Sequence, residues 1–297
     1  MPDMLLLLPD LLLIVGGFLL CRYTALDREV WAAAEKLVYY LLFPVLLFNS
    51  ISQSRLQPGQ TLALAGAGLA VLLGGVVLAY ALRAWPGVDA RSHASGAQVA
   101  FRFNSFVALA LAERLQGTQG VAWIALIVAV CVPVANVAAV WPLARHGGQG
   151  YLRELARNPL ILSTLAGLAA NLLGLKLPAP AAIGLQKIGL AALPLGLMAV
   201  GAGLRLGALK DAPRLAAALL AIRHLLLPLW ALLLARWLAL PAEQALLLLA
   251  FAALPTASSA YVLAVRMGGN GPFVAGLITL STLLGMVVLP LWLTVLR

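Results

Sequence analysis

The chain has 297 residues, of which 63% are hydrophobic and only 10% carry a charge. A soluble domain has about 25% charged residues, so this composition excludes an ordinary soluble enzyme, a nucleic-acid-binding domain and a disordered chain. The mean hydropathy is +1.01, and the Leu- and Ala-rich runs are continuous rather than alternating as in barrel strands. The sequence therefore predicts an all-α polytopic membrane protein.

Ten apolar runs along the chain are long enough for spanning helices, which need roughly 20 mostly apolar residues. The first run follows no basic segment and precedes no small-residue cleavage motif, so it predicts a retained span rather than a signal peptide. The connections between runs are short, and none of them predicts a separate soluble domain. The expected spans are 4–21, 31–53, 60–83, 95–115, 119–144, 158–175, 181–204, 213–238, 243–266 and 272–296.

The basic residues lie between the apolar runs, which indicates membrane topology rather than nucleic-acid binding, although the net charge is +10. Twelve Lys or Arg residues lie in or beside the loops that follow the odd-numbered spans, and six lie on the opposite side. Because cytoplasmic loops carry the excess of basic residues, both termini are expected outside the cytoplasm. We expect a multi-pass protein of the bacterial inner membrane with periplasmic termini.

Ten spans divide naturally into two units of five, and an odd number per unit places the second unit upside down relative to the first. Prolines support this division weakly, since Pro9 and Pro44 recur as Pro159 and Pro194 at an offset of 150 residues. The expected organisation is a first repeat at 1–146, a cytoplasmic connecting loop at 147–157 and a second, inverted repeat at 158–297.

The fourth span carries polar residues near its middle, where an Arg costs about 2.5–3.5 kcal/mol on the insertion scale. We interpret Arg102, Asn104 and Ser105 as part of a polar pocket in which Asn104 and Ser105 donate to an anionic substrate. The alternative is that the span begins near residue 101, so that Arg102 extends to the cytoplasmic headgroups.

The ninth span is interrupted by Pro255, which removes a helix donor and clashes with the preceding turn. A half-helix that starts here would direct unpaired N–H groups and its positive dipole end into the bilayer, which suits an anion. Alternatively, the segment is a proline kink whose hydroxyls bond back to carbonyls. Hydroxyl groups follow the proline within six residues, at Thr256, Ser258, Ser259 and Tyr261.

Three further polar positions inside spans have a functional and a structural interpretation. Asn49 either lines the pocket or makes an interhelical hydrogen bond. Asp10 is a candidate for proton coupling if it lies at membrane depth, and otherwise lies at the interface. His224 follows Arg223 within the eighth span and is more simply a packed side chain. Cys21 and Cys131 have no metal-binding spacing, so no metal, cofactor or disulfide is expected.

Several motifs of other protein classes are missing from the sequence. It has no phosphate-binding loop for an ATP-driven motor, no zinc-protease or serine-hydrolase motif, and no potassium-filter sequence. We therefore expect neither an enzyme nor a channel.

Five stretches of the chain, in order, resemble the motifs of the auxin efflux carrier family. The most specific is Leu254-Pro-Thr-Ala-Ser-Ser-Ala-Tyr261. The resemblance implies ten helices in two inverted five-helix repeats, with broken helices 4 and 9 crossing at the substrate site. Asn104 and the break at Pro255 and Thr256 would line this crossover. The five stretches are Leu37–Phe48, Arg102–Asn104 with 108–111, Asn158–Leu162, Ala192–Gly203 and Ala253–Ala264.

The family comprises secondary transporters, and it is similar in architecture to bile-acid sodium symporters. Its plant members export auxin, and its bacterial members include malate and malonate permeases. Many members have glycines after the first-repeat asparagine, whereas this chain has Ser105 and Phe106. That departure leaves the identity of the substrate open.

These observations predict a secondary carrier of a small organic anion, such as a mono- or dicarboxylate or an auxin-like acid, that works by alternating access. The alternative is a membrane receptor that binds such an anion without transporting it. The expected partners are this anion and the lipid bilayer, with no nucleic acid. The direction of transport, the coupling ion and the oligomeric state stay open, a homodimer being one of the alternatives.

Overall fold

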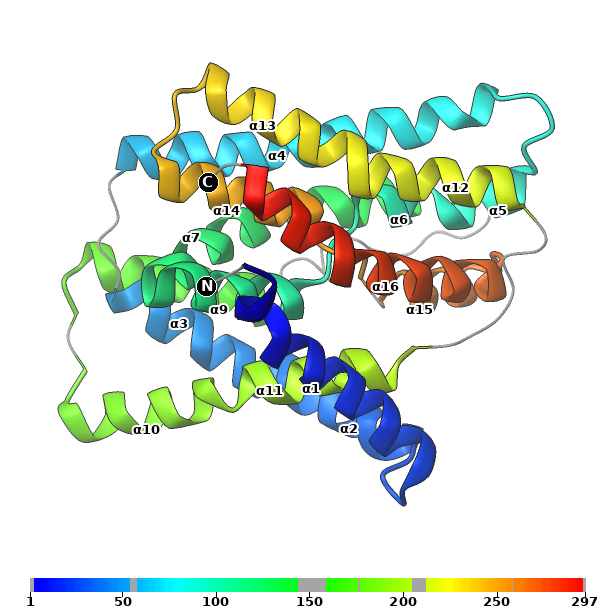
Figure 1. Ribbon diagram of the computed structural model, residues 1–297. Coiled ribbons are helices and arrows are strands. Elements are labelled where there is room, and N and C mark those ends of the chain that lie inside the picture. Colours follow the sequence, from blue (N-terminus) through cyan, green and yellow to red (C-terminus); the bar gives the residue numbers. More distant parts are fainter. Residues whose placement is uncertain are drawn as a thin grey trace. The chain divides into compact units, whose positions relative to one another are not determined.

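The computed structural model describes residues 3–53, 58–143, 159–175, 177–204, 212–257 and 259–295, and within them all regular structure is helical (Figure 1). Helical segments occupy all ten stretches that the sequence predicted as spans. In the first half of the chain they are α1 (Asp3–Tyr23), α2 (Arg28–Leu37), η1 (Val38–Leu42), α3 (Phe43–Gln53), α4 (Pro58–Ala81), η2 (Leu82–Ala84), α5 (Ala90–Gly96), α6 (Gln98–Phe101) and α7 (Ser105–Val140).

The second half contains α9 (Pro159–Leu172), α10 (Ala179–Leu190), α11 (Ala192–Ala202), α12 (Pro213–Ala221), η4 (Ile222–Leu226), α13 (Leu227–Trp237), α14 (Ala242–Ala253), α15 (Ser259–Arg266) and α16 (Gly271–Val295). Six segments of the described residues are long and apolar enough to cross a membrane, namely Arg28–Gln53, Thr61–Ala84, Ala90–Val140, Ala179–Ala202, Pro213–Trp237 and Gly271–Val295. The ten-span count and the inverted repeat stay predictions.

Helix α7 covers the end of one predicted span and most of the next. Its backbone is not helical at Gln116 and at Gly117, where φ is 55° and ψ is −144°. Only glycine adopts this conformation without strain. Two helices therefore follow one another within α7, as the separate spans 95–115 and 119–144 require.

The chain forms two compact units that do not coincide with its two halves. The first unit comprises residues 1–61, 109–129 and 150–203, and the second comprises 62–108, 130–149 and 204–297. Each unit therefore draws on both of the expected repeats, 1–146 and 158–297, and that division of the sequence remains a prediction.

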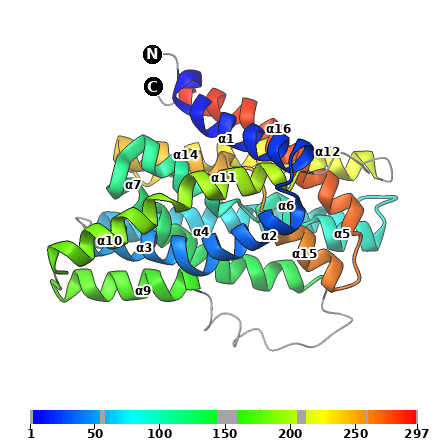
Figure 2. The same cartoon turned by 90° about the horizontal axis from the view of Figure 1, so that it is seen from below.

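In the first unit, small residues allow two helices to approach closely. Helix α1 packs against α11 (Figure 2). A Cβ at Gly17 would overlap the backbone of Met198, and one at Gly201 would overlap Ile14. Helix α3 packs against α9, where Asn171 Nδ2 donates to the carbonyl oxygen of Ile51 at 2.9 Å.

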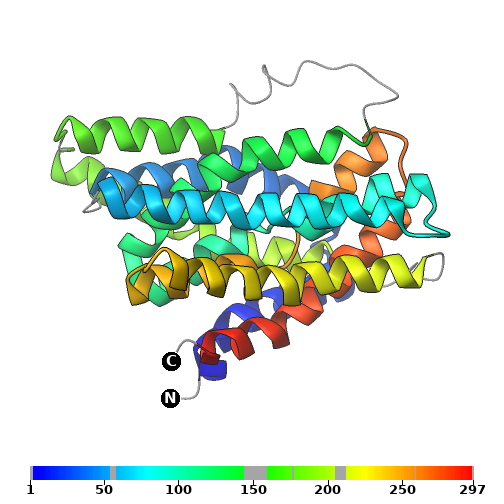
Figure 3. The same ribbon diagram turned by 90° about the horizontal axis from the view of Figure 1, so that it is seen from above.

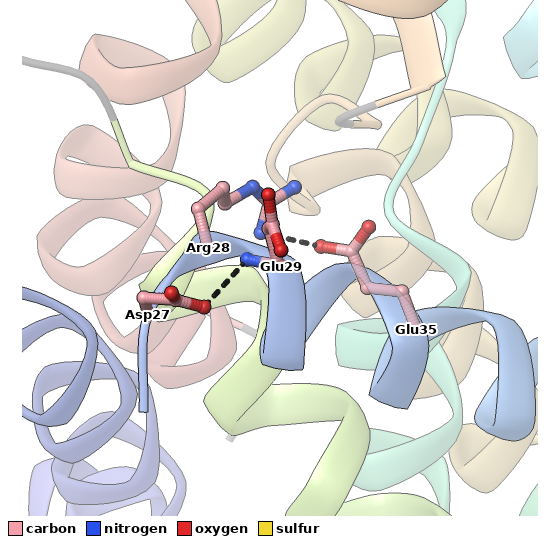
Figure 4. A network of polar contacts seen from close by, with 4 residues as sticks. All are labelled: Asp27, Arg28, Glu29 and Glu35. Carbon is pink, nitrogen blue, oxygen red and sulfur yellow. Dashed lines mark hydrogen bonds and ion pairs between the residues drawn. The ribbon is translucent and has the colours of Figure 1, made fainter. Parts of the chain in front are cut away.

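The start of α2, also in the first unit, is fixed by side-chain contacts (Figure 4). The carboxylate of Asp27 accepts from the N–H of Glu29 at 2.9 Å, as expected of a helix N-cap. Arg28 and Glu35 form an ion pair of 2.9 Å. Because the side chains are partly exposed, this pair adds little to stability.

In the second unit, α4 lies beside α12 and α13 (Figures 1 and 3). Trp230 Nε1 on α13 donates to the carbonyl oxygen of Ala70 on α4 at 3.3 Å. Helices α14 and α15 both pack against α16. At the start of α5, the N–H of Ser92 donates to Asp89, which lowers the pKa of this exposed carboxyl group.

Two five-residue turns of π-helix interrupt the helices, η1 in the first unit and η4 in the second. Each turn ends two residues before a proline, Pro44 or Pro228. A proline has no N–H to donate to the carbonyl four residues earlier, so the helix widens locally instead of closing a regular turn. For Pro228 the carbonyl is that of His224, which accepts from Trp292 Nε1 at 2.9 Å.

Candidate functional site

The first interruption predicted from the sequence is present in the second unit, between α6 and α7. Arg102 (φ −73°, ψ 145°) and Asn104 (φ −81°, ψ 102°) are extended. The buried Asn104 caps α7, because its Oδ1 accepts from the N–H groups of Phe106 at 3.0 Å and Val107 at 3.3 Å. No described residue accepts a hydrogen bond from its Nδ2.

This cap limits what the start of α7 offers to a ligand. Two of the backbone N–H groups at this helix end are already bonded to Asn104. The carboxamide N–H₂ group of Asn104, which is a donor only, is not used by the cap.

The second interruption lies between α14 and α15. Helix α14 ends at Ala253, residues 254–257 are not helical, and α15 begins at Ser259. Pro255 cannot donate to the carbonyl of Phe251 four residues earlier, which explains why the helix ends here. Thr256 is fully buried, and its hydroxyl has no hydrogen-bond partner among the described residues.

The two interruptions meet through the backbone. The N–H of Asn104 donates to the carbonyl oxygen of Pro255 at 2.9 Å. The rings of Phe103 and Phe251 pack edge to face beside this bond, with centroids 4.7 Å apart. The polar groups of both interruptions are thus collected at one place within the second unit.

Arg223 donates hydrogen bonds to carbonyl groups at the C-terminal end of α14. This side chain is 1% exposed, and its Nε donates to the carbonyl oxygen of Leu254 at 2.6 Å. Its Nη2 donates at 3.3 Å to the carbonyl of Phe251, which also accepts from the N–H of Leu254 at 3.4 Å in place of the N–H that Pro255 lacks. Sequence reasoning missed this role, although an Arg inside an apolar run is the same signal that singled out Arg102.

His224, the next residue, is linked to the other side of the break through Ser281. Its Nε2 lies 2.9 Å from the hydroxyl oxygen of Ser281 on α16. The same oxygen accepts from the N–H of Thr256 at 3.0 Å. The π-helical turn η4 therefore directs two consecutive side chains to the break. Ser281 carried no signal in the sequence.

Arg102 is held by two neutral amides. Its Nη1 donates to Gln98 Oε1 at 3.1 Å, and its Nη2 donates to Asn136 Oδ1 at 2.8 Å. Gln98 in turn donates to the carbonyl oxygen of Ala260 on α15 at 3.2 Å. The guanidinium group of Arg102 is thus tied to side chains of the second unit, which also connect the two interruptions.

The remaining predicted site residues are less closely involved. Ser105 and Ser259 are the first residues of α7 and α15, and Tyr261 is half-buried in α15. Ser258 lies outside the described residues, as does the side chain of Asp10 on α1.

Asn49 belongs to the first unit and is not among the residues that the second unit brings together. Its Oδ1 accepts from Gln53 Nε2 at 2.6 Å. The described residues include no group of three or more His, Cys, Asp or Glu side chains that could hold a metal ion.

A family model described as membrane transport protein matches residues 147–293. The match includes the break at 254–257, Arg223 and Ser281, whereas Asn104 precedes it. No curated protein matches the chain.

Proposed function

Because the chain belongs to the auxin efflux carrier family of membrane transport proteins, we propose that it is a secondary carrier of a small organic anion. Membership makes it a multi-pass membrane transporter rather than an enzyme. The observation that carries the finer proposal is the meeting of two broken helices through the bond from Asn104 to Pro255. Paired broken helices are the usual setting of a transporter's substrate site.

The charges of the second unit favour an anion. Two guanidinium groups, of Arg102 and Arg223, lie within or against the interruptions. The described acidic residues of this unit, Asp89 and Glu243, are both exposed. A carboxylate that enters the site would therefore meet positive charge and amide or hydroxyl donors, which bind anions strongly in a low dielectric.

The proposed binding groups are those collected at the break. The Asn104 carboxamide, the Thr256 hydroxyl and the first residues of α7 and α15 would donate to the substrate, with Arg102 supplying charge. Alternating access would then expose this crossover to each side of the membrane in turn. A mono- or dicarboxylate, malate and malonate among them, or an auxin-like acid fits this donor set.

Counterflow in proteoliposomes tests the proposal. Vesicles loaded with unlabelled malate, malonate or indole-3-acetate should accumulate the labelled form of the same acid from outside, since a carrier exchanges internal for external substrate. Vesicles with Asn104→Asp protein provide the control. Binding of an acid without any exchange would instead indicate a receptor and would refute the carrier.

The orientation proposed from the basic residues can be tested separately. With both termini in the periplasm, a cysteine placed at position 2 of a Cys-free variant should react with an impermeant thiol reagent in intact cells. One placed at position 149 should react only after the cells are opened. Labelling of position 149 from outside would overturn this orientation.

A further inference from the structure

Arg223 is a buried charge without a carboxylate partner among the described residues. Its hydrogen bonds go to the carbonyl oxygens of Leu254 and Phe251, at the C-terminal end of α14. Such a helix end carries a partial negative charge from its unpaired carbonyls. The guanidinium group therefore neutralises the end of a helix rather than a side chain.

Broken helices in transporters commonly use these same groups for another purpose. Where a helix ends at membrane depth, its last carbonyls and the unwound backbone that follows can coordinate a coupling sodium ion. Sodium takes oxygen ligands, and the break at 254–257 has oxygen ligands of this kind, the Leu254 carbonyl and the Thr256 hydroxyl among them. A fixed guanidinium group bonded to the Leu254 carbonyl competes for the position that such an ion would need.

We propose that Arg223 is a built-in counter-cation of the break at 254–257, so that the carrier moves its anion without a sodium ion. The inference rests on the proposed function, because a coupling ion matters only in a transporter. The charge is covalently part of the protein, and it stays bonded to the carbonyl groups at the C-terminal end of α14. It also supplies the positive charge that a transported cation would otherwise bring to an anion.

The surrounding geometry supports a fixed position for this charge. Arg223 belongs to η4, whose π-helical turn follows from the missing N–H of Pro228. Its neighbour His224 is tied to Ser281, which also accepts from Thr256. Arg223 thus bonds to the α14 side of the break, and His224 is linked to Thr256 through Ser281, which leaves the guanidinium group little freedom to withdraw.

Thermal melting of the purified protein in detergent tests this role without any substrate. Replacing sodium chloride by choline chloride at equal ionic strength should change the melting temperature of the wild type by less than about 1 °C. Arg223→Ala should melt lower, and millimolar methylguanidinium or sodium should raise its melting temperature by about 3 °C or more relative to choline, because a small cation can enter the vacated position.

Two further variants complete the design. Arg236→Ala removes an exposed arginine from the end of α13, so it should melt like the wild type and should not respond to methylguanidinium. Arg223→Lys keeps the charge on a single nitrogen and should be indifferent to sodium. If Arg223→Ala cannot be purified, the response of Arg223→Lys to sodium tests the proposal by itself.

The inference is overturned if sodium stabilises the wild type over choline, if folded Arg223→Ala responds to neither cation, or if Arg223→Lys acquires stabilisation by sodium. Failure of counterflow would refute the carrier without altering these melting temperatures. Failure of the melting experiment would remove the counter-cation and leave the carrier intact. The two proposals can therefore fail independently.

Discussion

Replacing Asn104 by Asp separates the capping of α7 from the binding of an anion. The Oδ1 atom of Asn104 accepts from the N–H groups of Phe106 and Val107, and an aspartate oxygen can accept both bonds equally well. Negative charge at a helix N-terminus is itself favourable by about 0.3–1 kcal/mol. The variant should therefore stay folded. It lacks the carboxamide N–H₂ group, however, and places a negative charge where a carboxylate is expected to bind.

The expected magnitudes differ between two variants. Asn104→Ala loses the cap, which costs about 1 kcal/mol, with a range of roughly 0.5–2 kcal/mol. The melting temperature should then fall by about 2–4 °C. Loss of a donor to a charged ligand costs about 1.5–3 kcal/mol, which is roughly a ten- to hundredfold loss of affinity. Asn104→Asp should lose at least as much affinity while it melts within about 2 °C of the wild type.

The assay combines melting in detergent with counterflow of the labelled acid in proteoliposomes. Asn104→Ser, whose hydroxyl can also cap a helix, provides the matched control for the cap. If Asn104→Asp exchanges substrate at the wild-type rate, the carboxamide does not face the anion and Asn104 is a helix cap only. If Asn104→Ala binds and transports like the wild type, the residue has neither role.

Three other changes have defined outcomes. Pro255→Ala should impair transport more than binding, because the restored N–H competes with Arg223 for the Phe251 carbonyl and extends α14; equal losses in counterflow and equilibrium binding would contradict this. Gly117→Ala should lower stability by about 1–3 kcal/mol at its positive φ, whereas Gly66→Ala on an exposed face of α4 should raise it by about 0.4–1 kcal/mol, both measured by melting. If Asp10 couples protons, Asp10→Asn should abolish the effect of a pH gradient on uptake and leave exchange unchanged; an unaltered gradient effect would remove it as a coupling group.

The positions of both interruptions could be predicted from the sequence because their causes are local. Pro255 removes a backbone donor wherever it stands in a helix. Asn104 favours a cap over a helix interior, since its side chain can accept from the N–H groups that follow it. Neither argument needs a neighbouring helix. The break at Pro255 was accordingly predicted from the residues themselves, whereas the break in the fourth span was predicted from the resemblance to the auxin efflux carrier family.

The partners of the break could not be predicted, because their contacts are remote in the chain. Arg223 bonds to residues 28 and 31 positions away, and Ser281 lies 57 positions from His224. Which face of an apolar helix turns inward depends on its neighbours when nearly every side chain is hydrophobic. Arg223 was therefore named only as the neighbour of His224, and Ser281 was not singled out.

The prolines supply a rule that would have helped to identify these remote hydrogen-bond donors from the sequence. Each proline inside a helix leaves the carbonyl four residues earlier without its donor, and a buried carbonyl must find another one. For Pro228 the acceptor is His224, and Trp292 Nε1 donates to it. For Pro255 the acceptor is Phe251, to which both the N–H of Leu254 and Arg223 donate. Trp and Arg are donors that cannot accept, so an unpaired carbonyl in an apolar helix points to the nearest such residue in a neighbouring one. The arginine in the eighth span thus adds to the bond from Leu254 at the carbonyl that the proline in the ninth leaves without its helical donor, and Arg223 and Pro255 should be mutated together to learn what either contributes.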